Sequence, residues 1–317
     1  MRKNVNTMTI EGRVYQHDLK IKQVQNKESE NFGKNYISGT LEVATDDECK
    51  NIVPIHYKYV APTYSSGKQN NSYTALEKII SGGTVMTAGI DGAIKVKCSP
   101  SVDVNEFYVE ENGELVLTGG KRPEGGFVNI VSTLNANVSE RCKFITDMVI
   151  SNITVNEPDN RPKTVGIHGL IFNFRNEVMT ADYIVTNEDA MKWFESLEVS
   201  SAEPLYTEIR GTLNFSTETY EKEVENAWGP NQVETHETKV KQWIVTGANP
   251  NAYEFGDENV LTMEELQSAL QAREVKRANI KKQKQEWEAQ KAANAANQTP
   301  IQTAAPTSTI QKKDFGF

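Results

Sequence analysis

The sequence has few cysteines and no long hydrophobic run. Its 317 residues include only three cysteines, which are widely spaced and odd in number. That pattern argues against a disulfide framework and against a zinc site. No apolar run approaches the roughly 20 residues that a membrane-spanning helix needs, and no apolar signal segment follows the basic first residues. The sequence therefore predicts a cytoplasmic protein without a membrane segment.

Short catalytic motifs are also missing. Neither of the two glycine–lysine segments, at 65–68 and 118–121, carries the earlier glycine of a phosphate-binding loop. The four histidines do not pair at metal-ligand spacing, and the sequence contains no CxxC or HExxH. We therefore expect no catalytic residues, no metal and no cofactor. Carboxylates that meet only in the folded chain leave an enzyme open as one alternative.

The net charge of −9 is unevenly distributed along the chain. Residues 1–133 hold 15 basic and 16 acidic residues, whereas residues 134–250 hold 10 basic and 18 acidic ones. An acidic protein does not coat nucleic acid by bulk charge alone. The nearly neutral first part can still form a local basic groove, and the acidic second part is expected to contact protein more than nucleic acid.

The first domain is expected to span residues 1–133 and to be organised around two adjacent strands. Residues 36–44 alternate between apolar and polar side chains, which is the period of a half-buried strand. Gly39 interrupts the apolar face and predicts a bulge. Residues 52–60 are rich in β-branched and aromatic residues and predict the next strand.

Three further strands and one short helix are expected in this domain. Residues 7–24 predict a long first strand, and residues 74–80 predict a helix capped by Ser72 or Thr74. The remaining expected segments are strands at 93–98 and 127–131, with a glycine-rich loop or hairpin at 99–126.

Three strands, a short helix and two strands form the order of a five-stranded Greek-key barrel of the oligonucleotide/oligosaccharide-binding (OB) type. Three segments resemble the first strands of single-stranded DNA-binding proteins of bacteriophages. These segments are GRVYQHDLKIK at 12–22, YISGTLEVATDD at 36–47 and VPIHYKYV at 53–60. The resemblance covers roughly residues 8–131. It implies an OB-fold barrel that binds single-stranded DNA, in the host cytoplasm if a phage encodes the protein.

A second barrel of the same class is expected over residues 140–250, because the plan of five strands and one helix repeats there. Its helix is expected over residues 188–197, with Asn187 as the cap. Turn-rich segments at 133–138 and 249–259 are expected to be linkers between separable domains. The predicted fold class is thus mainly β, with two tandem OB-fold-like barrels.

The remaining residues predict a helix and a tail. A capping-box pattern that starts at Thr262 announces a highly charged helix over residues 260–293. Such a helix is either free in solvent or packed on a partner by a narrow stripe. Residues 294–317 have the alanine, glutamine, threonine and proline content of a disordered tail.

Aromatic and basic side chains are interleaved in the first domain, as a site for single-stranded nucleic acid requires. Stacking of a base on an aromatic ring contributes ~1–3 kcal/mol whatever the base, while lysines follow the phosphates. In an OB fold the second and third strands and the flanking loops carry the site. The candidate nucleic-acid-binding residues are Tyr15, Lys20, Lys22, Phe32, Lys34, Tyr36, His56, Lys58, Tyr64, Lys68, Phe107, Tyr108, Lys121 and Arg122.

Several candidates have a purely structural alternative. Lys20 and Lys22 also suit a solvated strand face, and Tyr36 suits an ordinary surface position. Phe107 and Tyr108 can serve only to stabilise a hairpin by packing. These alternatives stay open at the level of the sequence.

Four other aromatic residues are expected in hydrophobic cores. Tyr57 and Tyr59 share the apolar parity of their strand. Trp193 and Phe194 lie on the short helix of the second domain and are expected to plug its barrel.

Three functions remain open. The first is binding and protection of single-stranded DNA in replication, recombination or repair, with replication or recombination proteins as further partners. The second is a β-rich structural protein of a virion or its tail, and the third is an enzyme with a carboxylate site. The aromatic and basic residues, the tandem barrels and the tail favour the first function, whereas an enzyme is expected to show a local motif. Self-association stays open.

The last residues of the chain suggest a docking segment for those protein partners. Asp314, Phe315 and Phe317 combine two rings with negative charge, which suits an apolar pocket with a basic rim. This end resembles the aromatic-ended acidic tails by which strand-coating proteins of bacteria and phages recruit replication enzymes. Lys312 and Lys313 depart from that pattern, because they cancel the negative charge of the tail.

Deletion of residues 314–317 is expected to leave the affinity for DNA nearly unchanged, because the rings belong to a partner contact and not to the barrel groove. The same deletion is expected to abolish association with a polymerase, helicase or recombinase of the same genome, measured by pull-down. Recovery of the same partners by the truncated chain would contradict the docking role.

Overall fold

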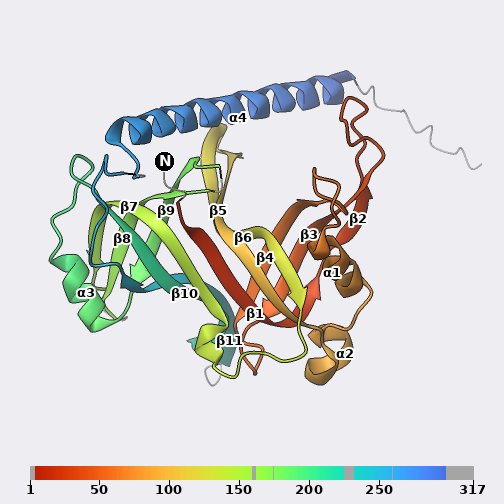
Figure 1. Cartoon of the computed structure of the whole chain (residues 1–317), viewed down its shortest axis with the longest axis horizontal. Helices are drawn as coiled ribbons and strands as arrows, with labels where there is room; N and C mark the ends of the chain where they lie inside the picture. Colours follow the sequence, from red (N-terminus) through yellow and green to blue (C-terminus); the bar gives the residue numbers. More distant parts are fainter. Residues whose placement is uncertain (1–3, 159–161, 174, 225–231, 259, 298–317) are drawn as a thin grey trace, which may run out of the picture.

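The computed structural model describes residues 4–158, 162–173, 175–224, 232–258 and 260–297. In these residues the fold is mainly β, which confirms the predicted fold class. A sheet of 11 strands closes into two barrels, and one long helix crosses above them (Figure 1). The end of the chain from residue 298, with Asp314, Phe315 and Phe317, lies outside the described residues.

Five strands close the first barrel. β1 pairs antiparallel with β3 and β5, β3 pairs with β4, β4 meets β6 in parallel, and β5 pairs with β6. This closed Greek-key ring is the OB arrangement, in which the helices lie between the third and fourth ring strands in chain order, here β4 and β5. The elements are β1 (Asn6–His17), β2 (Lys20–Gln23), β3 (Asn35–Ala44), β4 (Ile52–Val60), α1 (Asn71–Ile80), α2 (Val85–Gly92), β5 (Lys95–Glu111) and β6 (Glu114–Ile130).

The second barrel repeats this ring. β7 pairs antiparallel with β8 and β10, β8 pairs with β9, β9 meets β11 in parallel, and β10 pairs with β11. Its helix again lies between the third and fourth strands of the ring. The elements are η1 (Val138–Glu140), β7 (Cys142–Asn156), β8 (Thr164–Phe172), β9 (Val178–Val185), α3 (Glu188–Glu195), β10 (Leu205–Val224) and β11 (Gln232–Ala248).

The first strand of the first barrel is divided, contrary to the prediction of one strand over residues 7–24. β1 ends at His17, and the short edge strand β2 begins at Lys20. The division lies opposite the predicted bulge at Gly39, where the pairing of β3 with β4 shifts register. Gly39 has a φ of 138°, and a Cβ there would lie 2.7 Å from Asp18 Oδ1. The bulge therefore requires glycine.

Local signals determine most helix starts. Asn187 caps α3 as predicted, since its side chain accepts hydrogen bonds from two backbone N–H groups. The predicted cap of α1 was wrong, because Asn70 accepts from the Ser72 N–H and starts the helix earlier. The helix α2 was not predicted from the sequence.

Residues 99–126 form a hairpin and not a loop. β5 and β6 each contain 17 residues, and they pair from Val96↔Ile130 to Glu111↔Glu114. The outer half of this hairpin projects from the first barrel toward the long helix (Figure 1). The hairpin thereby becomes one wall of the space between the barrels.

The helices and barrels bury the aromatic residues mostly as expected. Tyr57 is buried in the first barrel, and Phe194 is buried with Trp193 packed beside it, which confirms both predictions. Tyr59 was predicted to be buried, but 46% of it is exposed. The prediction failed because the alternation of β4 ends after Tyr57, and both following residues are exposed.

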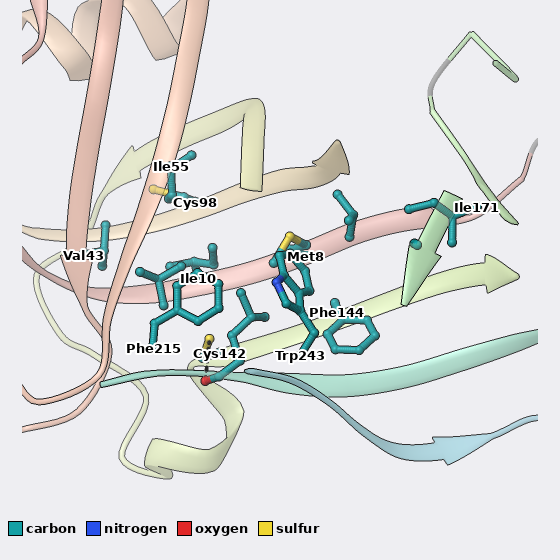
Figure 2. Close-up of a cluster of buried hydrophobic side chains, with 14 of the residues drawn as sticks. Met8, Ile10, Val43, Ile55, Cys98, Cys142, Phe144, Ile171, Phe215 and Trp243 are labelled. Carbon is teal, nitrogen blue, oxygen red and sulfur yellow. Dashed lines mark hydrogen bonds between the residues drawn. The ribbon is translucent and has the colours of Figure 1, made fainter. Parts of the chain in front are cut away.

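The two barrels share one hydrophobic core. β1 pairs with β7 from Asn6↔Thr146 to Ile10↔Cys142. Figure 2 shows Met8 and Ile10 of this strand between the side chains of the first barrel and those of the second. Cutting the chain between the barrels would therefore expose apolar residues of both, and the separability of the domains stays a prediction.

The side-chain amide of Asn6 joins the two barrels at the start of β1. Its Nδ2 donates to the backbone oxygens of Val102 and Phe172, at 2.8 Å each. Its Oδ1 accepts from the Val102 N–H at 2.8 Å. Val102 belongs to the first barrel and Phe172 to the second, so one side chain fixes both.

The long helix α4 (Met263–Asn297) starts on the second barrel. The predicted capping box is confirmed, because Thr262 and Glu265 exchange hydrogen bonds between side chain and backbone. Leu261 and Leu266 are buried against the second barrel. The helix continues beyond the expected end at residue 293. No helix in the described part of the chain is long and apolar enough to cross a membrane.

Asn6→Ala is expected to destabilise the whole molecule in one transition, because it leaves the Val102 N–H without its acceptor at the junction of the barrels. A stranded buried donor costs about 1–3 kcal/mol. Urea unfolding followed by fluorescence and circular dichroism measures this change. Asn129→Ala, at an exposed position of β6, is the control. Two separate transitions in the wild-type protein would contradict the shared core.

Candidate nucleic-acid interface

Two tyrosines stack on the outer side of β3 and β4. The ring centroids of Tyr36 and Tyr59 are 4.7 Å apart, with an interplanar angle of 28°. Lys22 of β2 lies directly opposite Tyr36 in the register of the sheet, so both point to the same face. We call the outer side of β2, β3 and β4 around Tyr36 and Tyr59 the tyrosine face.

Exposed lysines and loops border the tyrosine face. β2 is a four-residue edge strand whose residues are all exposed, and it carries Lys20 and Lys22. Phe32 and Lys34 are exposed in the connection from β2 to β3, where Lys34 Nζ donates to Asn31 Oδ1 at 3.0 Å. Exposed lysine side chains of this kind can contact the phosphates of a nucleic-acid strand, because few contacts within the protein restrain them.

Tyr64 and Lys68 lie in the exposed turn that follows β4. The Tyr64 N–H donates to the Lys68 carbonyl at 2.8 Å, which closes the turn. Tyr15 lies half-buried on β1. These three residues are not stacked on or paired with the tyrosine face in the described structure.

His56 occupies the outer side of β4 next to the face. Its Nδ1 lies 3.2 Å from Thr40 Oγ1. Burial, helped by the positive charge of Arg122, lowers the pKa of His56 below its usual value. This shift favours the neutral form of the imidazole over the cation.

Lys58 and Arg122 are neutralised within the protein. Lys58 Nζ lies 3.2 Å from Asp103 Oδ2 and 2.6 Å from Glu124 Oε1. Arg122 donates from Nε and Nη2 to Glu124 Oε2, at 3.0 and 2.7 Å. The sequence indicated the cations but not these carboxylates, which come from other strands than Lys58. A phosphate at this position must compete with both acids.

Phe107 and Tyr108 point to opposite sides of the β5–β6 hairpin, because neighbouring strand residues alternate. Phe107 is 43% exposed. Tyr108 is half-buried, and Lys281 Nζ of α4 lies 5.8 Å from its ring centroid. Tyr108 therefore belongs to the contact between the hairpin and α4.

Lys121 lies away from the tyrosine face. Its Nζ is 4.0 Å from the ring centroid of Tyr183 and 5.5 Å from that of Trp243, both in the second barrel. Burial lowers the pKa of Lys121 to about 7, although the charge of Asp182 opposes this shift. The structure thus places Lys121 between the barrels, where it supports packing.

A cleft runs from the tyrosine face into the space between the two barrels. Its volume is about 780 Å³. We call it the interbarrel cleft. Its walls are the end of β4, the base of the β5–β6 hairpin and the turn from β8 to β9, and α4 forms its roof. Residues that line it include Tyr59, Asp103, Asn173, Glu177, Arg273 and Ile280.

Ion pairs hold the roof in place. Arg273 and Arg277 both bind the Glu106 carboxylate of the β5–β6 hairpin, with Arg277 Nη2 at 2.6 Å. Lys276 Nζ lies 3.0 Å from Glu177 Oε2, near the turn of the second barrel. Although burial opposes it, the hydrogen bond from Arg277 and the charge of Arg273 lower the pKa of Glu106. The roof therefore contacts both barrels.

Two parts of this site were not predicted from the sequence. Tyr59 was assigned to the core from its parity, and α4 was not connected to the barrel at all. The signal for α4 was present in the spacing of Arg273, Arg277 and Ile280, which places them on one helix face. Among the described residues no group of three or more His, Cys, Asp or Glu side chains could hold a metal ion.

The chain matches one protein-family model and is weakly similar in structure to solved proteins. A family model described as YorF matches residues 4–286. Two solved structures of the single-stranded DNA binding protein from Thermus aquaticus align with 81% of this chain. The wild-type protein aligns over 98% of its length at 7% identity, with a TM-score of 0.46. A deletion mutant aligns over its full length at 8% identity, with a TM-score of 0.45. No curated protein sequence matches the chain significantly.

Lys121→Met is expected to stabilise the protein most below pH 7. Because the pKa of the folded lysine is about 7, the folded state then carries a buried charge that the unfolded chain keeps in water. Between pH 7 and the unfolded pKa of about 10.4, only the unfolded chain holds the proton. The free energy of unfolding of the wild-type protein therefore rises with pH, and the advantage of the Lys121→Met variant becomes smaller.

Urea midpoints of both proteins at pH 6 and pH 9 measure this difference. Lys68→Met, in the exposed turn after β4, is the control and should show no such pH dependence. If Lys121→Met is less stable at pH 6, the attraction of the ammonium to the two rings outweighs its desolvation.

Proposed function

The chain belongs to the YorF family, and we propose that it binds single-stranded DNA without sequence preference through the tyrosine face of its first barrel. The observation that carries this proposal is the stack of the half-buried Tyr36 and the exposed Tyr59 on the second and third strands of an OB barrel. In this fold those strands and the flanking loops bind oligonucleotides. Lys22 lies beside the stack and supplies positive charge.

The chemistry of the face suits unpaired bases better than a duplex. An exposed ring can stack on any base, because every base has a π face, and each stack contributes ~1–3 kcal/mol. The bases of a duplex are already stacked on one another and are not available to side chains on a sheet. A bound single strand is therefore expected to extend over Tyr36 and Tyr59, with its phosphates near Lys20 and Lys22.

The overall acidity of the protein fits this local mode of binding. Lys58 and Arg122 are already paired with Asp103 and Glu124. Few free lysines thus contribute to the release of counterions, and the salt dependence of binding is expected to be shallow. Stacking on the tyrosines carries most of the affinity.

In the cell, we propose that the protein coats single-stranded DNA in the cytoplasm during replication, recombination or repair of DNA, including that of a bacteriophage. It performs this role by binding DNA and not as an enzyme. The C-terminal tail, through Asp314, Phe315 and Phe317, recruits the enzymes of these processes. We further propose that DNA binds to the first barrel and that the acidic second barrel makes the protein contacts.

The full chain is expected to bind oligothymidylate much more tightly than duplex DNA of the same length. Tyr36→Ala and Tyr59→Ala should each weaken binding by ~1–3 kcal/mol if each ring stacks on a base. Fluorescence anisotropy over a salt series measures both effects.

The controls separate stacking from charge and from folding. Lys22→Ala should reduce the salt slope by about 0.7 for each phosphate that the lysine neutralises on a single strand. Met86→Ala changes an exposed apolar residue of α2 and should leave binding unchanged. Equal affinity for duplex and single strand would show that the tyrosine face is not the site.

A further inference from the structure

One face of α4 carries residues at a regular helical spacing. Residues three or four positions apart lie on the same side of an α-helix. The residues of this set follow one another at alternating intervals of four and three positions, and we call the set the roof stripe. It consists of Arg273, Arg277, Ile280, Lys284, Trp287 and Lys291.

The first half of the roof stripe faces the barrels. Arg273 and Arg277 bind Glu106 of the β5–β6 hairpin. Ile280 lines the interbarrel cleft together with Tyr59. These contacts fix the rotation of α4 about its axis, so the second half of the stripe continues on the same side.

The second half of the stripe runs over the first barrel. Trp287 lies two helical turns beyond Ile280, which is about 10 Å along the axis at 1.5 Å per residue. In Figure 1 this part of α4 passes above the first barrel toward the connection between β2 and β3. That connection carries Phe32 and Lys34 and borders the tyrosine face.

Trp287 forms a stacking surface between two lysines. The indole is 53% exposed, although an exposed tryptophan is costly in water. Lys284 Nζ lies 4.6 Å and Lys291 Nζ 5.3 Å from the ring centroid. An aromatic platform flanked by cations is the arrangement that binds the bases and phosphates of a single strand.

The charge of this segment favours an anionic ligand. Between residues 273 and 291 the sequence has seven basic and three acidic residues. Glu288 pairs with Lys284 at 3.1 Å, whereas Glu286 pairs with Lys282 on the opposite side of the helix, at 3.9 Å. Among the described residues, Lys291 makes no ion pair with a carboxylate.

We propose that the second half of the roof stripe is an additional site for single-stranded DNA, opposite the tyrosine face. This inference rests on the proposed function and names a part of the site that lies outside the barrel. Trp287 stacks on a base, Lys291 contacts a phosphate, and Lys284 contacts a second phosphate in competition with Glu288. The strand then passes between the barrel and α4 on its way from the tyrosine face to the interbarrel cleft.

Trp287→Ala tests the stacking role in the full chain. The affinity for oligothymidylate is expected to fall about 5- to 150-fold, the range that corresponds to loss of one stacked base. Trp287→Phe should restore most of it. Val275→Ala, which removes a 62% exposed apolar side chain on the other side of α4, is the matched control and should bind like the wild type. Circular dichroism checks that the helix is retained.

The lysines are tested with a second matched pair. Lys284→Ala is expected to lower the salt slope of binding, whereas Lys282→Ala removes the same charge on the opposite side and should not. Oligothymidylate should also quench tryptophan fluorescence in the wild-type protein, and this quenching should decrease in Trp287→Phe.

The outcomes separate this inference from the proposed function. If Tyr36→Ala weakens binding while Trp287→Ala behaves like Val275→Ala, the tyrosine face stands and the roof site is wrong. If the wild-type protein does not bind oligothymidylate, the proposed function fails as well. If Trp287→Ala instead abolishes a self-association seen by sedimentation and leaves DNA affinity unchanged, the stripe contacts a second copy, and the proposal is overturned.

Discussion

The pairing of β1 with strands of both barrels is the constraint on which the rest of the structure depends. The strand pairs with β5 and β3 in the first barrel and with β7 in the second. Each barrel closes its own ring, but neither can rotate without breaking backbone hydrogen bonds of the shared strand. Met8 and Ile10 fill the core on both sides of the junction (Figure 2). The relative orientation of the barrels, and hence the interbarrel cleft, follows from this strand.

A fixed orientation lets a single helix contact both barrels. Leu261 and Leu266 anchor the start of α4 on the second barrel. Arg273 and Arg277 then reach Glu106 on the hairpin of the first barrel. These ion pairs are partly buried and share one carboxylate, so removal of Glu106 would leave two cations in a region of reduced hydration. The same contacts set which face of α4 is directed at the interbarrel cleft.

Local patterns predicted what depends on neighbouring residues in the chain. The parity of residues 52–60 predicted the burial of Tyr57, and Gly39 marked a bulge that a Cβ would block. The order of strands and helices was sufficient to indicate two OB-like barrels, because this order is tied to one closed ring. Parity failed at Tyr59, because the shift in the pairing of β3 with β4 inserts one extra residue into β4 after Tyr57. Tyr59 is thereby turned to the outer side, and Val60 packs against the core.

The sequence by itself determined the mainly β class, both barrels, the helix caps at Asn187 and Thr262 and many of the aromatic and basic side chains of the first barrel. These features follow from spacing and from short-range hydrogen bonds. Only the tertiary structure decided which of the cations are free, which tyrosines stack and where α4 lies. Lys121 lies against Tyr183, and Lys58 lies against Glu124, through contacts between residues far apart in the chain. Such contacts depend on the closure of each barrel and on the shared strand, so no local pattern contains them.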